Sequence, residues 1–324
     1  MHGWLVKEFG GPEAMVWAEL PDLIPDPDEV VVEVYASGVN FAETRMRAGT
    51  YTGLETPIVL GLEGAGVVLS VGSSVKNCKE GERVFFRSRG SHATQCRVKD
   101  YHVFKLPSSW SFIEGAGSGV GWLTAWHALH LMARATAGQS VLIEAIASSV
   151  GTAALQIAKA KGCRVIGTAS QDGKLSKALE YGADAVINYK TENVYDRVMS
   201  FTDGSGLDVG CMTIGEETAS DLIASMGNEG KVIMYGSTGG RQVSFDLGIG
   251  SRNLQLISMS IDSSARYISE TIPSFRKGVV ENFVSGAFSP IIDTVLPVSD
   301  IVEAHQMVES RKHFGKIILS VREG

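Results

Sequence analysis

The turn Ala145–Gly151 is the first place where this sequence could carry chemistry. It lies between a short apolar run that predicts a buried strand, Val141–Ile143, and a helical pattern over Gly151–Lys161. The start of a helix offers unpaired N–H groups and a partial positive charge, which suit a pyrophosphate. The turn holds only one glycine, so the spacing G-x-G-x-x-G is absent. A helix start that is merely capped by Ser148 or Ser149 is an equal alternative.

The end of the next predicted strand is a second candidate site. NAD-binding sheets place an acid here to hold the ribose 2′-hydroxyl. This chain reads Thr168-Ala169-Ser170, with Lys174 shortly afterwards, so a hydroxyl and a cation stand where an acid would be expected. Asp172 is the alternative ribose ligand. The residues therefore favour NADPH over NADH as the cofactor.

Histidines and cysteines show no metal-binding pattern. His127 and His130 are three residues apart on a predicted helix, but no third ligand accompanies them, so we expect a packed or half-exposed pair. The cysteines are far apart and form no CxxC pair, which predicts buried free thiols at Cys78, Cys96, Cys163 and Cys211. The sequence therefore predicts no metal site.

Composition and charge limit the classes of partner. The chain has 324 residues, 44% hydrophobic and 20% charged, which is typical of a globular protein with two domains. Its net charge of −7 argues against binding to nucleic acid or to anionic membranes. No apolar run reaches the roughly 18 residues that span a bilayer, and Met1–Lys7 lacks the layout of a signal peptide. We expect a soluble, cytoplasmic protein.

The predicted elements are of two kinds. The first hundred residues contain β-branched runs separated by glycine and proline, which predict a mostly antiparallel barrel with strands at Val30–Tyr35, Gly64–Val71 and Arg83–Phe86. After about Ser118 the pattern becomes βαβαβ, which predicts a parallel sheet with helices on both faces. Beyond residue 262 we expect helices over Pro273–Val284 and Ser299–Ser310 and a last strand over Lys316–Val321 that returns to the barrel. The predicted fold class is α/β.

Short motifs follow one another in a characteristic order along the chain. In the first half they are Glu8-Phe9-Gly10-Gly11-Pro12-Glu13, Ala36-Ser37-Gly38-Val39-Asn40-Phe41, Arg47-x-Gly49-x-Tyr51 and Gly61-x-Glu63-x-x-Gly66. In the second half they are Leu123-Thr124-Ala125-Trp126, Gly182-Ala183-Asp184, Ile187-Asn188-Tyr189 and Gly315-Lys316-Ile317. Each motif alone is weak. Together they resemble the quinone oxidoreductase branch of the medium-chain dehydrogenase/reductase superfamily, the zinc-free branch that contains zeta-crystallin.

The resemblance implies a fold and an activity. It implies a GroES-like β-barrel domain from residues 1–118 and 258–324, interrupted by a Rossmann domain at residues 119–257. It implies NADPH-dependent reduction of a small quinone or α,β-unsaturated carbonyl compound, with the nicotinamide between the domains. Relatives commonly form homodimers through an edge strand, for which Leu254–Ser258 is the candidate.

The resemblance also implies chemistry without zinc. Zinc alcohol dehydrogenases of the same superfamily carry a cysteine and a histidine at two of these motifs, where this chain has Asn40 and Leu62. Neither residue offers the thiolate or imidazole that zinc prefers. The closely spaced cysteines of the structural zinc lobe are absent as well.

The family pattern gives roles to individual residues. Asn40 and Tyr51 are the catalytic candidates, and Tyr51 corresponds to a proton donor of related enoyl-thioester reductases. A loop tyrosine and a buried amide in a turn are the structural alternatives. The cofactor-binding candidates are Thr124, Ser148, Ser149, Val150, Gly151, Ser170, Lys174, Tyr189, Gly236 and Ser237. An ordinary helix-start threonine is the alternative for Thr124, a solvated helix charge for Lys174, and a plain turn for Gly236-Ser237.

Several residues of the nucleotide half depart from the family pattern. Relatives mostly have two glycines in place of Ser148-Ser149 and a small residue in place of Ile146. An acid is usual where Met212 stands, and a glycine where Glu229 stands. Three functions therefore remain open: an NADPH-dependent quinone or enone reductase, an enoyl-thioester reductase of a fatty-acid or polyketide pathway, and a non-redox binding protein on a reductase scaffold.

Overall fold

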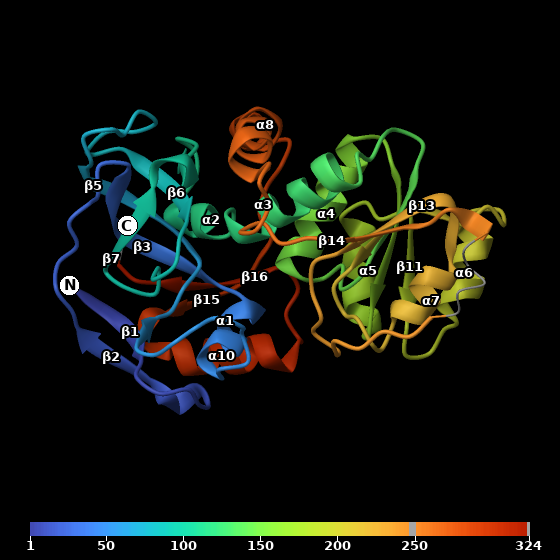
Figure 1. Cartoon of the computed structure of the whole chain (residues 1–324), viewed down its shortest axis with the longest axis horizontal. Coiled ribbons are helices and arrows are strands. Elements are labelled where there is room, and N and C mark those ends of the chain that lie inside the picture. The colour runs from blue at the N-terminus through green and yellow to red at the C-terminus, as the bar shows by residue number, and fades with distance from the viewer. Residues whose placement is uncertain (246–250, 323–324) are drawn as a thin grey trace. The chain divides into compact units, whose positions relative to one another are not determined.

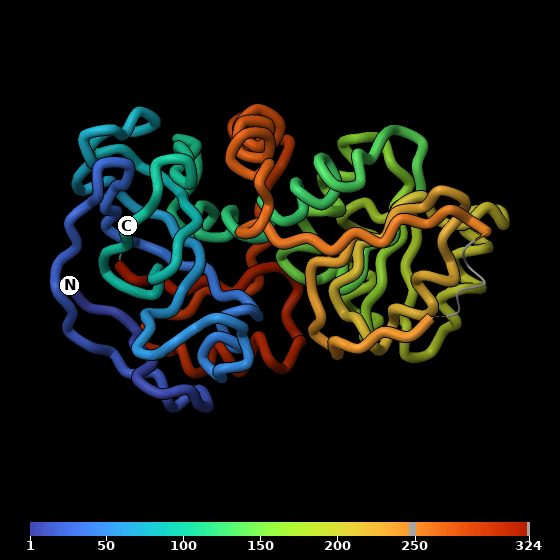
Figure 2. Tube along the Cα trace, viewed as in Figure 1, coloured from blue at the N-terminus to red at the C-terminus, as the bar shows by residue number. Residues whose placement is uncertain are grey.

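The computed structural model describes residues 1–245 and 251–322 of the chain. Backbone contacts divide it into two compact units. The first unit joins Met1–Val120 to the chain from Arg276 onward, and the second unit is Gly121–Phe275. Figure 2 shows the blue N-terminal and the red C-terminal segments within the same unit. The C-terminal segment thus returns to the N-terminal unit.

The first unit is built on two sheets. A seven-stranded sheet has the order β15-β16-β3-β5-β6-β8, with β7 also paired to β3, and all its pairs except β15–β16 are antiparallel. β-branched runs fill its interior, because their side chains pack well on a pleated surface. Its strands are β3 (Glu29–Val39), β5 (Glu63–Val71), β6 (Arg83–Arg87), β7 (Gln95–Lys99), β8 (Val103–Lys105), β15 (Ile292–Pro297) and β16 (Lys316–Ser320). A smaller sheet consists of β2 (Met15–Glu19), β1 (His2–Val6) and β4 (Ile58–Val59).

Short helices close the first unit. They are η1 (Pro12–Ala14), α1 (Phe41–Arg47), η2 (Asp100–His102), α2 (Phe112–Ala116), η6 (Arg276–Val280), α9 (Glu281–Ser285), η7 (Val298–Asp300) and α10 (Ile301–Ser310). α10 packs beside α1, which brings the C-terminal segment to the start of the chain (Figure 1). Asn40 is the N-cap of α1, and its backbone N–H donates to Glu43 Oε2 at 2.8 Å.

The second unit contains a parallel sheet of six strands in the order β11-β10-β9-β12-β13-β14. Its strands are β9 (Ser140–Ile143), β10 (Arg164–Ala169), β11 (Ala185–Asn188), β12 (Leu207–Met212), β13 (Met226–Met234) and β14 (Gln255–Ser258). The helices are α3 (Val120–Trp126), η3 (His127–Met132), α4 (Ser149–Ala160), α5 (Asp172–Glu180), α6 (Val194–Phe201), α7 (Ala219–Ala224), η5 (Tyr267–Thr271) and α8 (Ile272–Phe275). The predicted α/β class is confirmed, and so is the βαβαβ order of the middle third.

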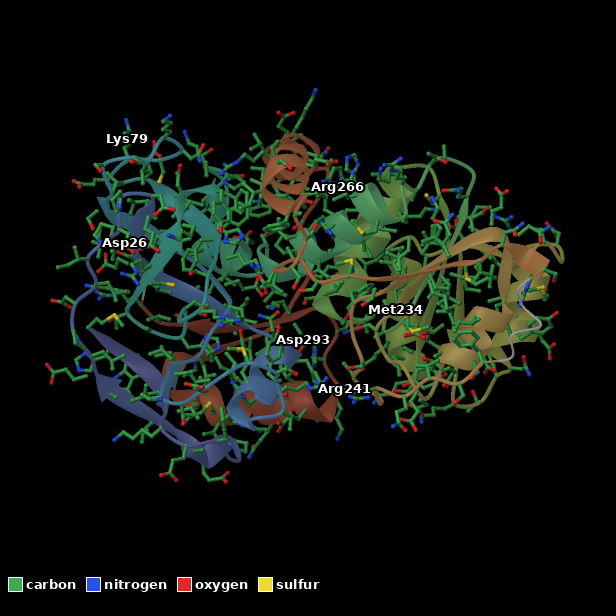
Figure 3. All side chains as sticks on the ribbon, viewed as in Figure 1. Asp26, Lys79, Met234, Arg241, Arg266 and Asp293 are labelled. Carbon is green, nitrogen blue, oxygen red and sulfur yellow. The ribbon has the colours of Figure 1, made fainter. Side chains whose placement is uncertain are left out.

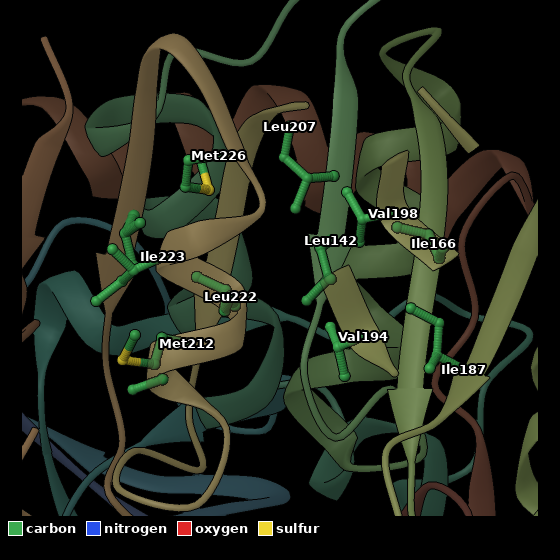
Figure 4. Close-up of a cluster of buried hydrophobic side chains, with 12 residues drawn as sticks. Leu142, Ile166, Ile187, Val194, Val198, Leu207, Met212, Leu222, Ile223 and Met226 are labelled. Carbon is green, nitrogen blue, oxygen red and sulfur yellow. The ribbon is translucent and has the colours of Figure 1, made fainter. Parts of the chain in front are cut away.

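A buried apolar cluster holds helices against this sheet. Leu142, Ile166 and Ile187 project from three adjacent strands toward Val194 and Val198 of α6 (Figure 4). Because the strands are parallel, their carboxyl ends meet at one edge of the sheet. The turns after β9, β10, β12 and β13 therefore gather there, and these turns hold most of the predicted cofactor-binding residues.

The second boundary between the units differs from the predicted one at 257/258. The segment 258–275 stays with the second unit because its helices contact the helix around His127. The imidazole Nδ1 of His127 lies 2.7 Å from Thr271 Oγ1, and the indole Nε1 of Trp126 donates to Ser274 Oγ at 3.0 Å. These side-chain contacts keep residues 258–275 in the second unit, and hydrophobic periodicity in the sequence does not reveal them.

The remaining structural predictions agree with the fold in most details. The half-buried His130 stacks on the Trp126 ring at 4.3 Å and the buried His127 lies beside Thr271, so each histidine packs against another residue of the protein. All four cysteines are free, and three are buried, whereas Cys78 is only half-buried. No helix within residues 1–245 and 251–322 is long and apolar enough to cross a membrane.

Candidate cofactor site and buried polar network

The turn after β9 is capped by its own serine. Ser148 is the N-cap of α4, and its hydroxyl oxygen accepts the Gly151 N–H at 3.0 Å. From the sequence, this capping role was the alternative to phosphate binding at this turn. The first N–H groups of a helix have no intrahelical partner, so those of Ser149 and Val150 remain suited to an anion. The structure therefore shows the cap, and phosphate binding at this turn stays a prediction.

Two glycines allow the tight packing of this turn. A Cβ at Gly151 would lie 2.5 Å from the Ala145 carbonyl oxygen, so only glycine fits where α4 crosses the turn. A Cβ at Gly167 would lie 2.1 Å from Ile146 Cδ1. The large side chain of Ile146 is therefore accommodated by the glycine in the neighbouring strand β10, and it is fully buried.

The end of β10 meets the end of β11. The Tyr189 N–H donates to the Ala169 carbonyl at 3.2 Å, which places Tyr189 beside Ser170 in the chain path. The side chain of Asp172 accepts a hydrogen bond from the Asn188 amide at 2.7 Å, so this carboxylate is engaged within the protein. Lys174 lies in the first turn of α5 and is half-buried. The donors predicted for a 2′-phosphate thus share one edge of the sheet.

The turn after β13 packs closely on the segment after β12. β13 ends at Met234, labelled in Figure 3, and a Cβ at Gly236 would lie 2.3 Å from Thr213 Oγ1. The Thr213 carbonyl accepts the Thr238 N–H at 3.0 Å, and the Ile214 carbonyl accepts the Gly239 N–H at 2.7 Å. Gly236-Ser237 is therefore a constrained turn whose glycine is required by space.

Glu144 is a residue that the sequence interpretation missed. It follows β9 directly and is 1% exposed, and its Oε2 accepts the N–H groups of Thr213 and Ile214, each at 2.7 Å. Its other oxygen accepts the hydroxyl of Thr218. Burial raises the pKa of the Glu144 carboxyl, and these three hydrogen bonds only partly oppose that rise. The detectable signal was an acid at the end of the apolar run Val141-Leu142-Ile143.

Thr124 lies within α3 and not at its start. It is half-buried between the buried residues Leu123 and Ala125. The alternative of a helix-start threonine is therefore wrong.

A network of buried charges surrounds Asn40 in the first unit. Lys316 Nζ donates to Asn40 Oδ1 at 2.6 Å and also pairs with Glu63, and both charged side chains are at most 2% exposed. The Asn40 amide nitrogen donates to Glu63 Oε1 at 2.9 Å and to Glu43 Oε1 at 3.2 Å. The second oxygen of Glu63 accepts the Val120 N–H at 2.7 Å. The Asn40 amide is therefore held by charged neighbours on both its oxygen and its nitrogen.

Tyr51 has a different environment. Its side chain is 37% exposed, and its backbone N–H donates to the Arg45 carbonyl at 3.2 Å. The ring therefore projects from a turn that is anchored through the backbone.

Glu43, His92 and His305 could suggest a metal site. Their potential ligand atoms lie within 4.8 Å of one another, and all three residues are buried. However, Arg47 Nη1 lies 3.1 Å from His305 Nδ1, and a guanidinium can only donate, so Nδ1 accepts and the proton of the neutral ring is on Nε2. Burial, together with the charges of His92 and Arg47, lowers the pKa of His305 to about 3, which keeps this ring neutral. His305 thus presents an N–H to the cluster, where a metal would require a lone pair.

The Glu43–His92 pair favours the ionised form of a fully buried carboxyl group. Glu43 Oε2 lies 3.2 Å from His92 Nε2, and both side chains are fully buried. Burial raises the pKa of Glu43, but the charge and hydrogen bond of His92, the charge of Lys316 and the Asn40 N–H outweigh this and leave the pKa below its usual value.

We expect Glu43→Gln to lower the free energy of unfolding at neutral pH by about 3–5 kcal/mol, because it breaks a buried charge pair. A carboxyl whose pKa is lowered by folding stabilises the protein above its unfolded pKa, about 4.5, and loses this contribution as the pH falls. The difference between the two proteins should therefore shrink below about pH 4.5. Urea denaturation at several pH values measures it. Glu114→Gln, which changes the exposed capping box of α2, is the matched control and should cost about 1 kcal/mol or less. A difference that stays constant with pH would contradict this account of Glu43.

Comparison with known proteins identifies the family. Residues 26–133 match the model of the alcohol dehydrogenase GroES-like domain, and residues 149–277 match that of the zinc-binding dehydrogenases. Quinone oxidoreductase from Homo sapiens is 31% identical over 98% of this chain and 97% of its own length. Quinone oxidoreductase 1 of Escherichia coli is 30% identical over 96% of this chain and 97% of its own. A crystal structure of Escherichia coli quinone oxidoreductase complexed with NADPH is 28% identical, with a TM-score of 0.91 and coverage of 99% of this chain and 100% of that one. With its antiparallel and Rossmann-type units in the family's order, the chain belongs to the quinone oxidoreductases of the medium-chain dehydrogenase/reductase superfamily and is an oxidoreductase of that type.

Proposed function

We propose that this protein uses NADPH to reduce quinones or α,β-unsaturated carbonyl compounds, without a metal ion. The observation that carries the proposal is the edge of the parallel sheet. There the first N–H groups of α4 suit a pyrophosphate, and the hydroxyl of Ser170 and the cation of Lys174 suit a 2′-phosphate. Asp172, the alternative ligand of an unmodified ribose, is bonded to Asn188. NADPH, when bound, supplies the hydride.

The first unit supports the metal-free part of this proposal. The amide of Asn40 is occupied by Lys316, Glu63 and Glu43. Leu62 packs with an apolar cluster. The protein's own groups must then orient the substrate and supply protons. Because Asn40 Nδ2 already donates to two carboxylates, we assign Asn40 to positioning and Tyr51, with its partly exposed ring, to proton donation.

Lys174→Ala should weaken NADPH binding about 10- to 100-fold and leave NADH binding almost unchanged, because a charge-assisted hydrogen bond to phosphate would be lost. Titration of the cofactor's fluorescence measures both constants. Lys177→Ala, one turn further along α5 and exposed, is the matched control and should change neither. Equal losses for NADPH and NADH would remove Lys174 from the 2′-phosphate site.

Tyr51→Phe should separate the two substrate classes. A quinone needs no dedicated proton donor, whereas a carbanion left after hydride transfer to an enone does. We expect kcat for enones to fall about 100-fold while quinone turnover is retained. If CoA-linked enoyl thioesters prove the best substrates and share this loss, the enoyl-thioester reductase alternative is favoured. Unchanged enone turnover would exclude Tyr51 as the donor.

We also propose that the protein is a homodimer formed through β14. This strand is the last of the parallel sheet, and Leu256 on it is 37% exposed. A strand edge of this kind offers unpaired backbone groups to a second copy. Sedimentation equilibrium should give twice the chain mass of 34.6 kDa for the wild type and a smaller mass for Leu256→Lys. A wild-type mass of one chain would contradict the proposal.

A further inference from the structure

The carboxylate of Glu144 connects two turns of the proposed cofactor site. Glu144 is the first residue after β9 and begins the turn that leads to α4. Its side chain accepts the N–H groups of Thr213 and Ile214, and the carbonyls of these same two residues accept N–H groups from the turn after β13. One buried side chain thus orders the segment between the Ser148–Gly151 turn and the Gly236-Ser237 turn.

Glu144 also lies close to where negative charge would bind. The next residue, Ala145, has a positive φ of 47°, and its carbonyl oxygen contacts the position of Gly151 in the first turn of α4. Glu144 precedes Ser149, the first residue of α4, by five residues, so its charge belongs to the turn that would hold the pyrophosphate. For two unit charges about 10 Å apart in a medium of effective dielectric constant about 20, the interaction changes a binding constant on the order of tenfold.

We propose that Glu144 is a positioning residue of the dinucleotide site, which holds Thr213–Thr218 in place and takes up a proton when the cofactor's pyrophosphate binds. The inference rests on the proposed use of NADPH. Glu144 would make cofactor affinity depend on pH, an effect that we assign neither to the Ser148-Ser149 turn nor to Lys174. The cofactor should bind more tightly as the pH falls and the carboxyl becomes neutral.

The groups around Glu144 leave it as the titrating member of its surroundings. Burial raises the pKa of Cys211 on β12 to about 12 and raises that of Tyr235 after β13 well above 10, so both are neutral between about pH 5 and pH 8. Near Thr218, Lys190 and Glu217 pair with each other at the surface. Burial likewise raises the pKa of Glu144, and its three hydrogen bonds partly oppose that rise.

Glu144→Gln tests the proposal because it removes the charge and keeps the shape. The amide oxygen can still accept the two backbone N–H groups, and its nitrogen can donate to the Thr218 hydroxyl. The matched control is Asp208→Asn: Asp208 Oδ2 joins β12 to β9 by accepting the Ser140 N–H at 2.7 Å, at the amino ends of these strands. Calorimetric titration with NADP⁺, which is stable in acid, gives Kd for each full-length protein from about pH 5 to pH 8.

The readout is the ratio of the wild-type Kd to the Glu144→Gln Kd. It should be on the order of tenfold near pH 8 and fall toward one near pH 5. Titration of the cofactor's own 2′-phosphate affects both proteins and cancels in this ratio. The ratio for Asp208→Asn should not vary with pH. A Glu144→Gln ratio that is constant with pH, or weaker binding by Glu144→Gln at every pH, would overturn the inference.

A second measurement needs no variant. Titration of the wild type with NAD⁺, which carries the pyrophosphate but no titrating 2′-phosphate, in two buffers of different ionisation enthalpy should show protons taken up on binding near pH 6. Release of protons, or none exchanged, would overturn the inference even if Glu144→Gln fails to fold. Absence of NADP⁺ and NADPH binding by the wild type would instead overturn the proposed function, and the inference with it.

Discussion

Backbone N–H groups without partners, at the carboxyl ends of parallel strands, are the constraint on which the second unit depends. Each such group must find an acceptor or lose the free energy of a hydrogen bond. The chain supplies two acceptors of its own: the Ser148 hydroxyl for Gly151, and the Glu144 carboxylate for Thr213 and Ile214. The remaining N–H groups at the start of α4 are those that a dinucleotide phosphate can satisfy. In this view the protein and its cofactor share one set of donors.

The need for each buried polar group to have a partner also explains the interior of the first unit. Each buried carboxylate around Asn40 has a partner beside it: the Lys316 cation for Glu63, and the His92 imidazole for Glu43. A buried charge without a partner is costly, whereas a paired one fixes the geometry of its neighbours. Asn40 is held by these pairs, which is why we assign it to positioning. The hydrogen bonds also determine where protons lie, and they argue against a metal at His305.

Much of the fold follows from local sequence patterns. Short apolar strands alternating with helical segments predict the parallel sheet, and Gly162, just after the C-cap of α4, has the positive φ of 79° that favours a glycine there. The nucleotide turn and its capping serine could also be located. Contacts between distant residues could not. Lys316 and Glu63 are 253 positions apart, and nothing in either local motif shows that they form a pair. Glu144 was overlooked because its partners are backbone groups of a segment that only the strand order brings beside it.

Cofactor use is tested by titration of the wild-type protein with NADPH and, separately, with NADH, followed by the fluorescence of the reduced nicotinamide. We expect saturable binding of NADPH with a Kd of about 1–100 μM and binding of NADH at least about tenfold weaker, because the 2′-phosphate adds charge-assisted hydrogen bonds. Equal affinity for the two cofactors would contradict the role of Lys174 and Ser170. Absence of binding by either would contradict the reductase function and favour a binding protein on a reductase scaffold.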